Sequence, residues 1–140
     1  MATRIQVVID CADPDGLATF WAEALGYTKL DPPEGYATWW DFETAQAIPQ
    51  DELNSWHAVV DPDGAGPRVY FHRVPEPKRG KNRLHLDLAV ARDVPPEEYR
   101  RRIDDEADRL RQVGATKLHA VENTASTGSP CWTPKGTSSI

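Results

Sequence analysis

Two copies of one short unit constrain the fold of this chain more than any other feature of its sequence. The segments Gly26–Leu30 (Gly-Tyr-Thr-Lys-Leu) and Gly114–Leu118 (Gly-Ala-Thr-Lys-Leu) match at four of five positions. Each follows a stretch with apolar residues at helical spacing, and each continues as a strand-like run. Because the match falls at equivalent points of two strand–helix–strand patterns, it indicates an internal repeat within the 140 residues.

The first copy begins with the β-branched segment 5–10, which predicts a strand. Asp13 and Pro14 then supply a helix N-cap and a proline in the first turn, and Gly26 is placed for a left-handed C-cap. A second strand is predicted over residues 27–30. One apolar helix face lies between the caps, formed by Leu17, Phe20, Trp21, Ala24 and Leu25.

A hairpin completes the first copy after an insertion over residues 31–55. Residues 57–60 and 68–74 are typical of strands, and the Asp-Pro-Asp-Gly sequence at 61–64 is a strong turn signal. The insertion is rich in aromatic residues and could cover a binding site as a lid. We therefore expect the first module to span residues 1–74.

The second copy follows a proline- and glycine-containing linker at residues 75–83. Residues 84–90 alternate apolar and polar side chains, which predicts a strand with one buried face. A helix is predicted from Asp93 to Gly114. Its apolar stripe consists of Tyr99, Ile103, Ala107, Leu110 and Val113. The start of the second module thus spans residues 84–122, and the whole chain is expected to form one structural domain.

Four sequence segments carry a resemblance to a known superfamily. They are Val8–Pro14, Phe20–Tyr27, Val59–Gly64 and Val74–Leu88. With the repeated order, they resemble the glyoxalase, bleomycin-resistance and extradiol-dioxygenase group (the vicinal-oxygen-chelate superfamily), and they look like its actinobacterial glyoxalase-like subgroup. The resemblance implies an α+β fold of two βαβββ modules in tandem, whose curved mixed sheets form a cup. It also implies a small-molecule ligand in the cup, often a divalent metal, and a homodimer.

Residues 123–140 depart from that pattern. The second module should end in two further strands, yet this tail is rich in Ser, Thr, Gly and Pro without apolar alternation, which predicts loop or disorder. Read one nucleotide earlier, the codons of Cys131 and Trp132 force a leucine, and those of Trp132 and Thr133 force an aspartate. Other permitted codons complete a strand–turn–strand ending. We hypothesise a frameshift near Asn123, against a naturally divergent tail; encoding DNA incompatible with the alternate frame would exclude it.

The resemblance also implies candidate metal ligands. Gln6 lies seven residues before Asp13, where relatives carry His or Gln, and His85 takes the corresponding place in the second module. His72 stands about where relatives carry a carboxylate. These nitrogen and oxygen donors could hold Zn, Ni, Mn or Fe in an open site. The alternative, which the weak Gln ligand favours, is that Gln6 and His85 are hydrogen-bonded residues of a metal-free cup.

Aromatic residues and one carboxylate form further candidates. A ligand pocket that stacks on an aromatic molecule is predicted from Trp39, Trp40, Trp56 and Tyr70. The alternative for the tryptophans is ordinary packing. Asp87 shares a strand face with His85, so it could orient that histidine or act as a general base. More often such an aspartate only accepts hydrogen bonds at a strand edge.

The composition of the chain limits the classes of binding partner and the cellular compartment that we expect. A net charge of −6 argues against nucleic acid, since phosphate binding needs an excess of Lys and Arg. No signal peptide or membrane-spanning stretch is evident, and Cys11 and Cys131 form no disulfide framework, so a cytoplasmic location is expected. Two functions stay open: metal-assisted lyase or isomerase chemistry on a small organic molecule, or metal-free small-molecule binding and sequestration of the bleomycin-resistance type.

Overall fold

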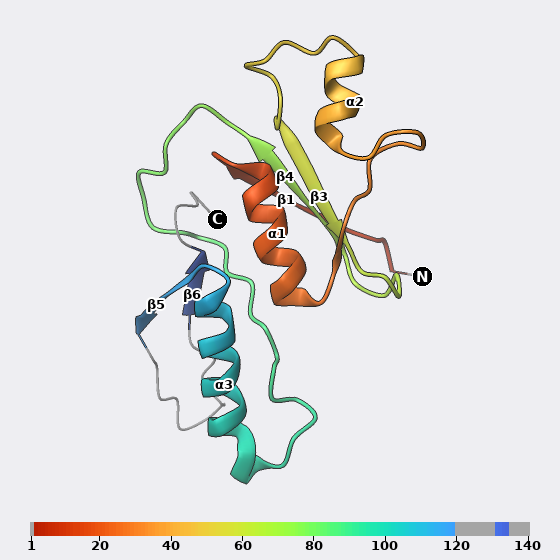
Figure 1. The fold of residues 1–140 in the computed structure, drawn as a ribbon. Coiled ribbons are helices and arrows are strands. Elements are labelled where there is room, and N and C mark those ends of the chain that lie inside the picture. Colours follow the sequence, from red (N-terminus) through yellow and green to blue (C-terminus); the bar gives the residue numbers. More distant parts are fainter. Residues whose placement is uncertain (1, 120–130, 135–140) are drawn as a thin grey trace. The chain divides into compact units, whose positions relative to one another are not determined.

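The computed structural model of the chain describes residues 2–119 and 131–134, which are drawn in colour in Figure 1. It contains two compact units, Met1–Arg79 and Gly80–Ile140. The boundary falls within the segment 75–83 that the sequence predicts as a linker. The architecture is α+β, and no helix in the described ranges is long and apolar enough to cross a membrane.

The first unit has the order βαβββ, with one additional helix in its insertion. Its elements are β1 (Gln6–Cys11), α1 (Pro14–Leu25), β2 (Thr28–Lys29), α2 (Trp39–Ala45), β3 (Trp56–Val60) and β4 (Arg68–Arg73). The strands form one mixed sheet in the order β1-β4-β3-β2. In this sheet β1 runs parallel to β4, and the other neighbouring strands are antiparallel. The sequence patterns of the first module are confirmed in their order.

Local signals fix both ends of α1, which lies across one face of the sheet (Figure 1). The carboxylate of Asp13 accepts a hydrogen bond from the backbone N–H of Gly16 at 3.1 Å, as an N-cap does. Gly26 ends the helix with φ 67°, a conformation that glycine adopts without steric cost. The core between helix and sheet is formed by Ile9, Cys11, Leu17, Phe20, Val59 and Phe71.

The second unit contains a helix and a two-stranded antiparallel sheet. A short 3-10 turn, η1 (Pro96–Glu98), leads into α3 (Tyr99–Gln112), and β5 (Ala115–His119) pairs with β6 (Cys131–Pro134). Ala107 and Leu110 are buried beside Ala115, as the predicted apolar stripe requires. The pairing also corrects the prediction for the tail. Four of its residues form strand β6, because β5 offers them a hydrogen-bonding edge, whereas 120–130 and 135–140 lie outside the described residues.

The strand predicted over residues 84–90 is not formed, and that prediction was wrong. The segment keeps its alternation, since Leu86, Leu88 and Val90 are less exposed than the residues between them. However, no strand in the described part of the chain pairs with it, and a strand exists only where a neighbour completes its hydrogen-bond ladder. The described residues of the second unit therefore show helix and strands without the full βαβββ order.

Candidate functional site

The sheet of the first unit has two chemically different faces. Side chains alternate between the faces along each strand, and the register places Ile9, Phe71 and His57 together on the face that α1 covers. The opposite face, which we call the open face, carries the residues at the alternate positions. They are Gln6, Val8, Asp10, Trp56, Ala58, Arg68, Tyr70 and His72.

Aromatic rings occupy the middle of the open face. The rings of Trp56 and Tyr70 are stacked, with centroids 5.6 Å apart and planes inclined by 10°. The Trp39 ring, from α2, meets Trp56 edge to face with centroids 4.9 Å apart, and we call these three residues the aromatic row. The same ring also lies 6.1 Å from that of His57, whose side chain belongs to the covered face. Ala58 pairs with Tyr70 on the same face and is fully buried, which fits rings that lie over its small side chain. The structure thus brings together three of the four predicted pocket residues.

The insertion holds Trp39 in place. Trp39 is the first residue of α2, whose N-cap Thr38 accepts a hydrogen bond from the backbone N–H of Asp41 at 3.1 Å. Its indole Nε1–H donates to the carbonyl oxygen of Leu30 at 2.8 Å. Trp40, by contrast, is 57% exposed and has no ring partner among residues 2–119. The predicted pocket therefore divides into an ordered row and one separate tryptophan.

Arg68 lies at one end of the aromatic row. Its guanidinium carbon is 5.5 Å from the centroid of the Tyr70 ring, within the range of a cation–π interaction. Its Nη1 donates a hydrogen bond to Oε1 of Gln6 at 3.1 Å. The Nε atom is buried and has no hydrogen-bond partner within the described structure. This end of the open face consequently carries a fixed positive charge with unused donors.

His72 and Asp10 form the other end of the open face. They are register partners on β4 and β1, and His72 Nδ1 lies 3.7 Å from Asp10 Oδ1. Both side chains are more than half exposed. A carboxylate beside a histidine can hold the ring in one orientation. The tilted rings of His72 and Tyr70, 6.5 Å apart, connect this pair to the aromatic row.

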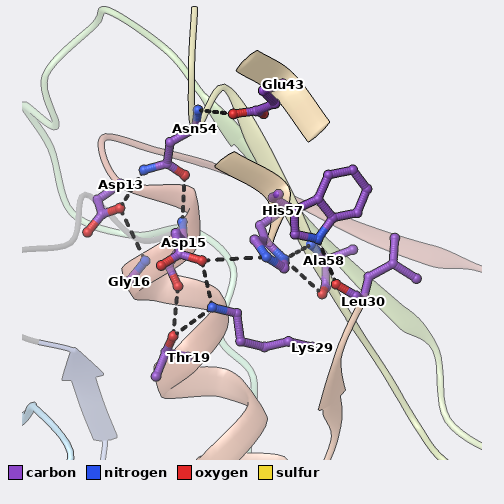
Figure 2. Close-up of polar contacts among 11 residues, drawn as sticks. Asp13, Asp15, Gly16, Thr19, Lys29, Leu30, Glu43, Asn54, His57 and Ala58 are labelled. Carbon is purple, nitrogen blue, oxygen red and sulfur yellow. Dashed lines mark hydrogen bonds and ion pairs between the residues drawn. The ribbon is translucent and has the colours of Figure 1, made fainter. Parts of the chain in front are cut away.

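A polar cluster that includes the buried His57 connects the covered face of the sheet to α1, and Figure 2 shows it around the first turn of that helix. His57 Nε2 lies 3.5 Å from Asp15 Oδ1, and Lys29 Nζ donates to the same oxygen at 2.6 Å. Asn54 Oδ1 accepts from the backbone N–H of Asp15 at 2.9 Å. Burial lowers the pKa of His57, with a further contribution from the charge of Lys29. The cluster connects α1 to β2 and β3. Its contacts therefore hold in place the strands whose opposite side is the open face.

Comparison with known proteins identifies the family. A family model described as a glyoxalase-like domain matches residues 6–137.

This chain belongs to the glyoxalase-like domain family.

The match includes β6 and most of the tail that departs from the expected pattern. No curated protein and no solved structure matches the chain. Membership of the glyoxalase-like family supports small-molecule binding or metal-dependent chemistry in general terms, and it assigns no reaction.

Two of the predicted metal ligands lie far apart on the first sheet of this glyoxalase-like domain. Gln6 and His72 share the open face, but they lie four register positions apart, or roughly 13 Å along the strands. Val8 and Tyr70 occupy the positions between them. The oxygen that Gln6 would offer to a cation already accepts a hydrogen bond from the positively charged Arg68. Gln6 and His72 therefore do not fit as two ligands of one ion.

The remaining predicted residues belong to the second unit of the glyoxalase-like domain. His85 and Asp87 are exposed and lie in the segment 84–90 that forms no strand. Among the residues that the structure describes, no three His, Cys, Asp or Glu side chains are grouped so that they could hold a metal ion. The predicted set is thus divided between the units, with Gln6 and His72 in the first.

Two residues of the open face were missed by the sequence prediction. Asp10 and Arg68 have the same strand parity as Gln6 and Tyr70, so the alternation rule already contained the signal. Arg68 is not among the predicted metal ligands because a guanidinium does not ligate metals. The His57 cluster gave no sequence signal, since its members come from elements that meet only through the fold of the first unit.

Proposed function

We propose that this glyoxalase-like domain binds a small aromatic molecule on the open face of its first sheet, without a metal ion. The stacking of Trp56 on Tyr70 is the observation that carries the proposal. Large flat side chains on a sheet face away from the covering helix offer apolar area and defined geometry to a planar ligand. The geometry of Gln6 and His72 supports a metal-free site.

The chain offers a matched pair of tryptophans for the test. Trp56 lies in the aromatic row, whereas Trp40 is exposed and outside it. Ligand-observed NMR and calorimetry would compare aromatic fragments with saturated ring compounds of equal size, after dialysis against a chelator. We expect aromatic fragments to bind preferentially, and Trp56→Leu to weaken them by about tenfold through lost stacking and burial.

The variant Trp40→Leu is the control and should bind as the unmodified protein does. Circular dichroism would establish that each variant is folded. Equal affinity for aromatic and saturated fragments would reject the proposal, as would equal losses in the Trp40 and Trp56 variants. Binding that appears only after a divalent metal is restored would reject its metal-free part.

A second candidate function is proton transfer on the bound molecule by His72 and Asp10. Their 3.7 Å contact at the exposed end of the open face favours it, because a carboxylate can hold a histidine in position for acid–base work. The test is turnover of any fragment that binds. His72→Gln should abolish turnover while leaving the dissociation constant unchanged within about a factor of three. Turnover that persists in this variant would exclude His72 as the proton-transferring group.

A further inference from the structure

The open face is chemically polarised along its length. Arg68 lies at one end and Tyr70 in the middle. The other end carries the exposed Asp10–His72 pair together with Trp56, the register partner of His72, whose ring stacks on Tyr70. The Arg68 and His72 positions are four residues apart on β4, or roughly 13 Å. A ligand that extends along β4 from Arg68 over Tyr70 to His72 therefore meets a cation at one end and a carboxylate with a histidine at the other.

The charge of Arg68 has no carboxylate partner among the described residues. Its contacts are the Gln6 carboxamide oxygen and the ring of Tyr70, both of which are uncharged. A guanidinium has five N–H donors, and the bond to Gln6 uses one of them. The Nε–H is shielded from solvent and unpaired, although buried polar groups normally find partners. The two Nη groups keep N–H donors beyond the bond to Gln6, and a carboxylate can accept a pair of them.

We infer that the ligand of the open face is an aromatic carboxylate, bound with its carboxyl group on Arg68 and its ring against Tyr70 and Trp56. The inference rests on the proposed function and adds the charge and orientation of the ligand. The net charge of −6 does not attract anions to the protein from a distance, so the selectivity must come from Arg68 itself. The Asp10 carboxylate disfavours a second anionic group at the other end and accepts a hydrogen bond from a hydroxyl group or an amine.

Pairs of probes that differ only in charge test this inference. Benzoate is compared with benzamide, and 2-naphthoate with 2-naphthamide, because each pair has the same ring and nearly the same shape. Calorimetry and saturation-transfer NMR measure the ratio of the two dissociation constants for each pair. We expect the carboxylate to bind about tenfold or more tightly than the amide, since hydrogen bonds to charged groups are the stronger ones. The ratio should fall as salt is raised.

Variants at Arg68 assign the preference to this residue. Arg68→Gln should bring the ratio close to one, and Arg68→Lys should keep only part of the preference, because an ammonium retains the charge without the planar fork. Arg101→Gln removes an equal charge from an exposed position on α3 and should leave the ratio unchanged. Both dissociation constants of a ratio are measured on the same variant, so a general loss of affinity does not change the ratio. If Arg68→Gln does not fold, the comparison of Arg68→Lys with the unmodified protein tests the inference.

The possible outcomes distinguish a failure of the predicted charge preference from a failure of the proposed aromatic binding. If the amides bind as tightly as the carboxylates, the aromatic site stands and the inference on charge is overturned. If the preference survives in Arg68→Gln, the anion is recognised elsewhere and the inference is again overturned. If no aromatic probe of either charge binds, the proposed function fails together with the inference.

Discussion

The Nε2 atom of His57, near the start of β3, lies 3.5 Å from the Oδ1 atom of Asp15 in the first turn of α1 (Figure 2). The Nδ1 atom of His57 accepts a hydrogen bond from the backbone N–H of Ala58 at 2.9 Å. In the neutral ring the proton therefore resides on Nε2, where it faces the carboxylate. Both nitrogens are engaged, so this histidine is a structural residue that connects strand and helix.

This arrangement predicts a loss of stability on mild acidification. Burial lowers the pKa of His57 from its ordinary value of 6.5, and the charge of Lys29 acts in the same direction. The backbone contact with Ala58 and the charges of Asp15 and Glu43 oppose this shift without cancelling it. The unfolded chain therefore binds the proton more readily than the folded one. The free energy of unfolding should fall as the pH drops below 6.5 and continue to fall until the lowered pKa of the folded state is passed.

Urea denaturation between about pH 5 and pH 8 would measure this effect. The variant His57→Asn keeps a hydrogen-bond acceptor near the Ala58 N–H and removes the titration, so its stability should depend less on pH. His72→Gln, at an exposed histidine, should keep the full dependence. Equal pH profiles for the unmodified protein and His57→Asn would contradict the prediction.

The carboxyl groups of Asp61 and Glu106 also have lowered pKa values, but they affect stability only at more acidic pH, below 3.8 and 4.5 respectively.

The turn between β3 and β4 predicts a measurable coupling between two residues. A Cβ atom at Gly66 would collide with the hydroxyl oxygen of Tyr27 and lie 3.2 Å from Oδ2 of Asp61. Asp61 itself accepts backbone hydrogen bonds within this turn, including one from Ala65 at 3.0 Å. Gly66→Ala should therefore destabilise the protein by about 1–3 kcal/mol, the usual cost of overpacking.

Removing the tyrosine hydroxyl should relieve the closest part of that collision. The double variant with Tyr27→Phe is expected to be more stable than the sum of the two single effects predicts, which a double-mutant cycle by thermal denaturation would detect. Gly80→Ala is the control, because no atom of the described residues lies within 4 Å of its Cβ position. Strictly additive effects would show that Tyr27 does not cause the strain.

The N-cap of α1 predicts a graded response to substitution. Asp13 accepts hydrogen bonds from the backbone of Gly16 and from the side chain of Asn54, the latter at 2.9 Å. Asp13→Ala should lower the free energy of unfolding by about 1–2 kcal/mol, because it removes the cap and this second contact. Asp13→Asn should cost much less, since asparagine caps helices nearly as well. Similar losses for both variants, measured by urea denaturation, would show that the negative charge and not the cap is important.

The proposed metal-free site predicts indifference to divalent metals. Dialysis against a chelator, followed by addition of Zn²⁺, Ni²⁺ or Mn²⁺, should shift the melting temperature by less than a degree or so, because metal that bound the folded state would raise it. Calorimetry would show no stoichiometric uptake. A 1:1 heat signal that disappears in both Gln6→Ala and His72→Ala would instead restore these residues as ligands.

The sequence predicted the first unit well because its elements carry local signals. Asp13 and Gly26 mark the ends of α1, and strand alternation alone places Tyr70 and His72 on one face. Segment 84–90 failed because alternation does not supply the neighbouring strand that a ladder requires. The predicted ligand pair of Gln6 and His72 could not be judged without the register of β1 on β4, which sets their separation.

The insertion, which could cover a binding site, is held to the rest of the first unit near both of its ends. Trp39 donates a hydrogen bond to the carbonyl oxygen of Leu30 at one end. Near the other end, the side chain of Asn54 forms hydrogen bonds with Asp13 and Asp15 at the start of α1. Segments tied in this way are preorganised, so little conformational entropy remains to be lost when a ligand arrives. We therefore expect association close to the rate of simple diffusional encounter, with no slow closing step, and differences in affinity among ligands expressed mainly in how fast they leave.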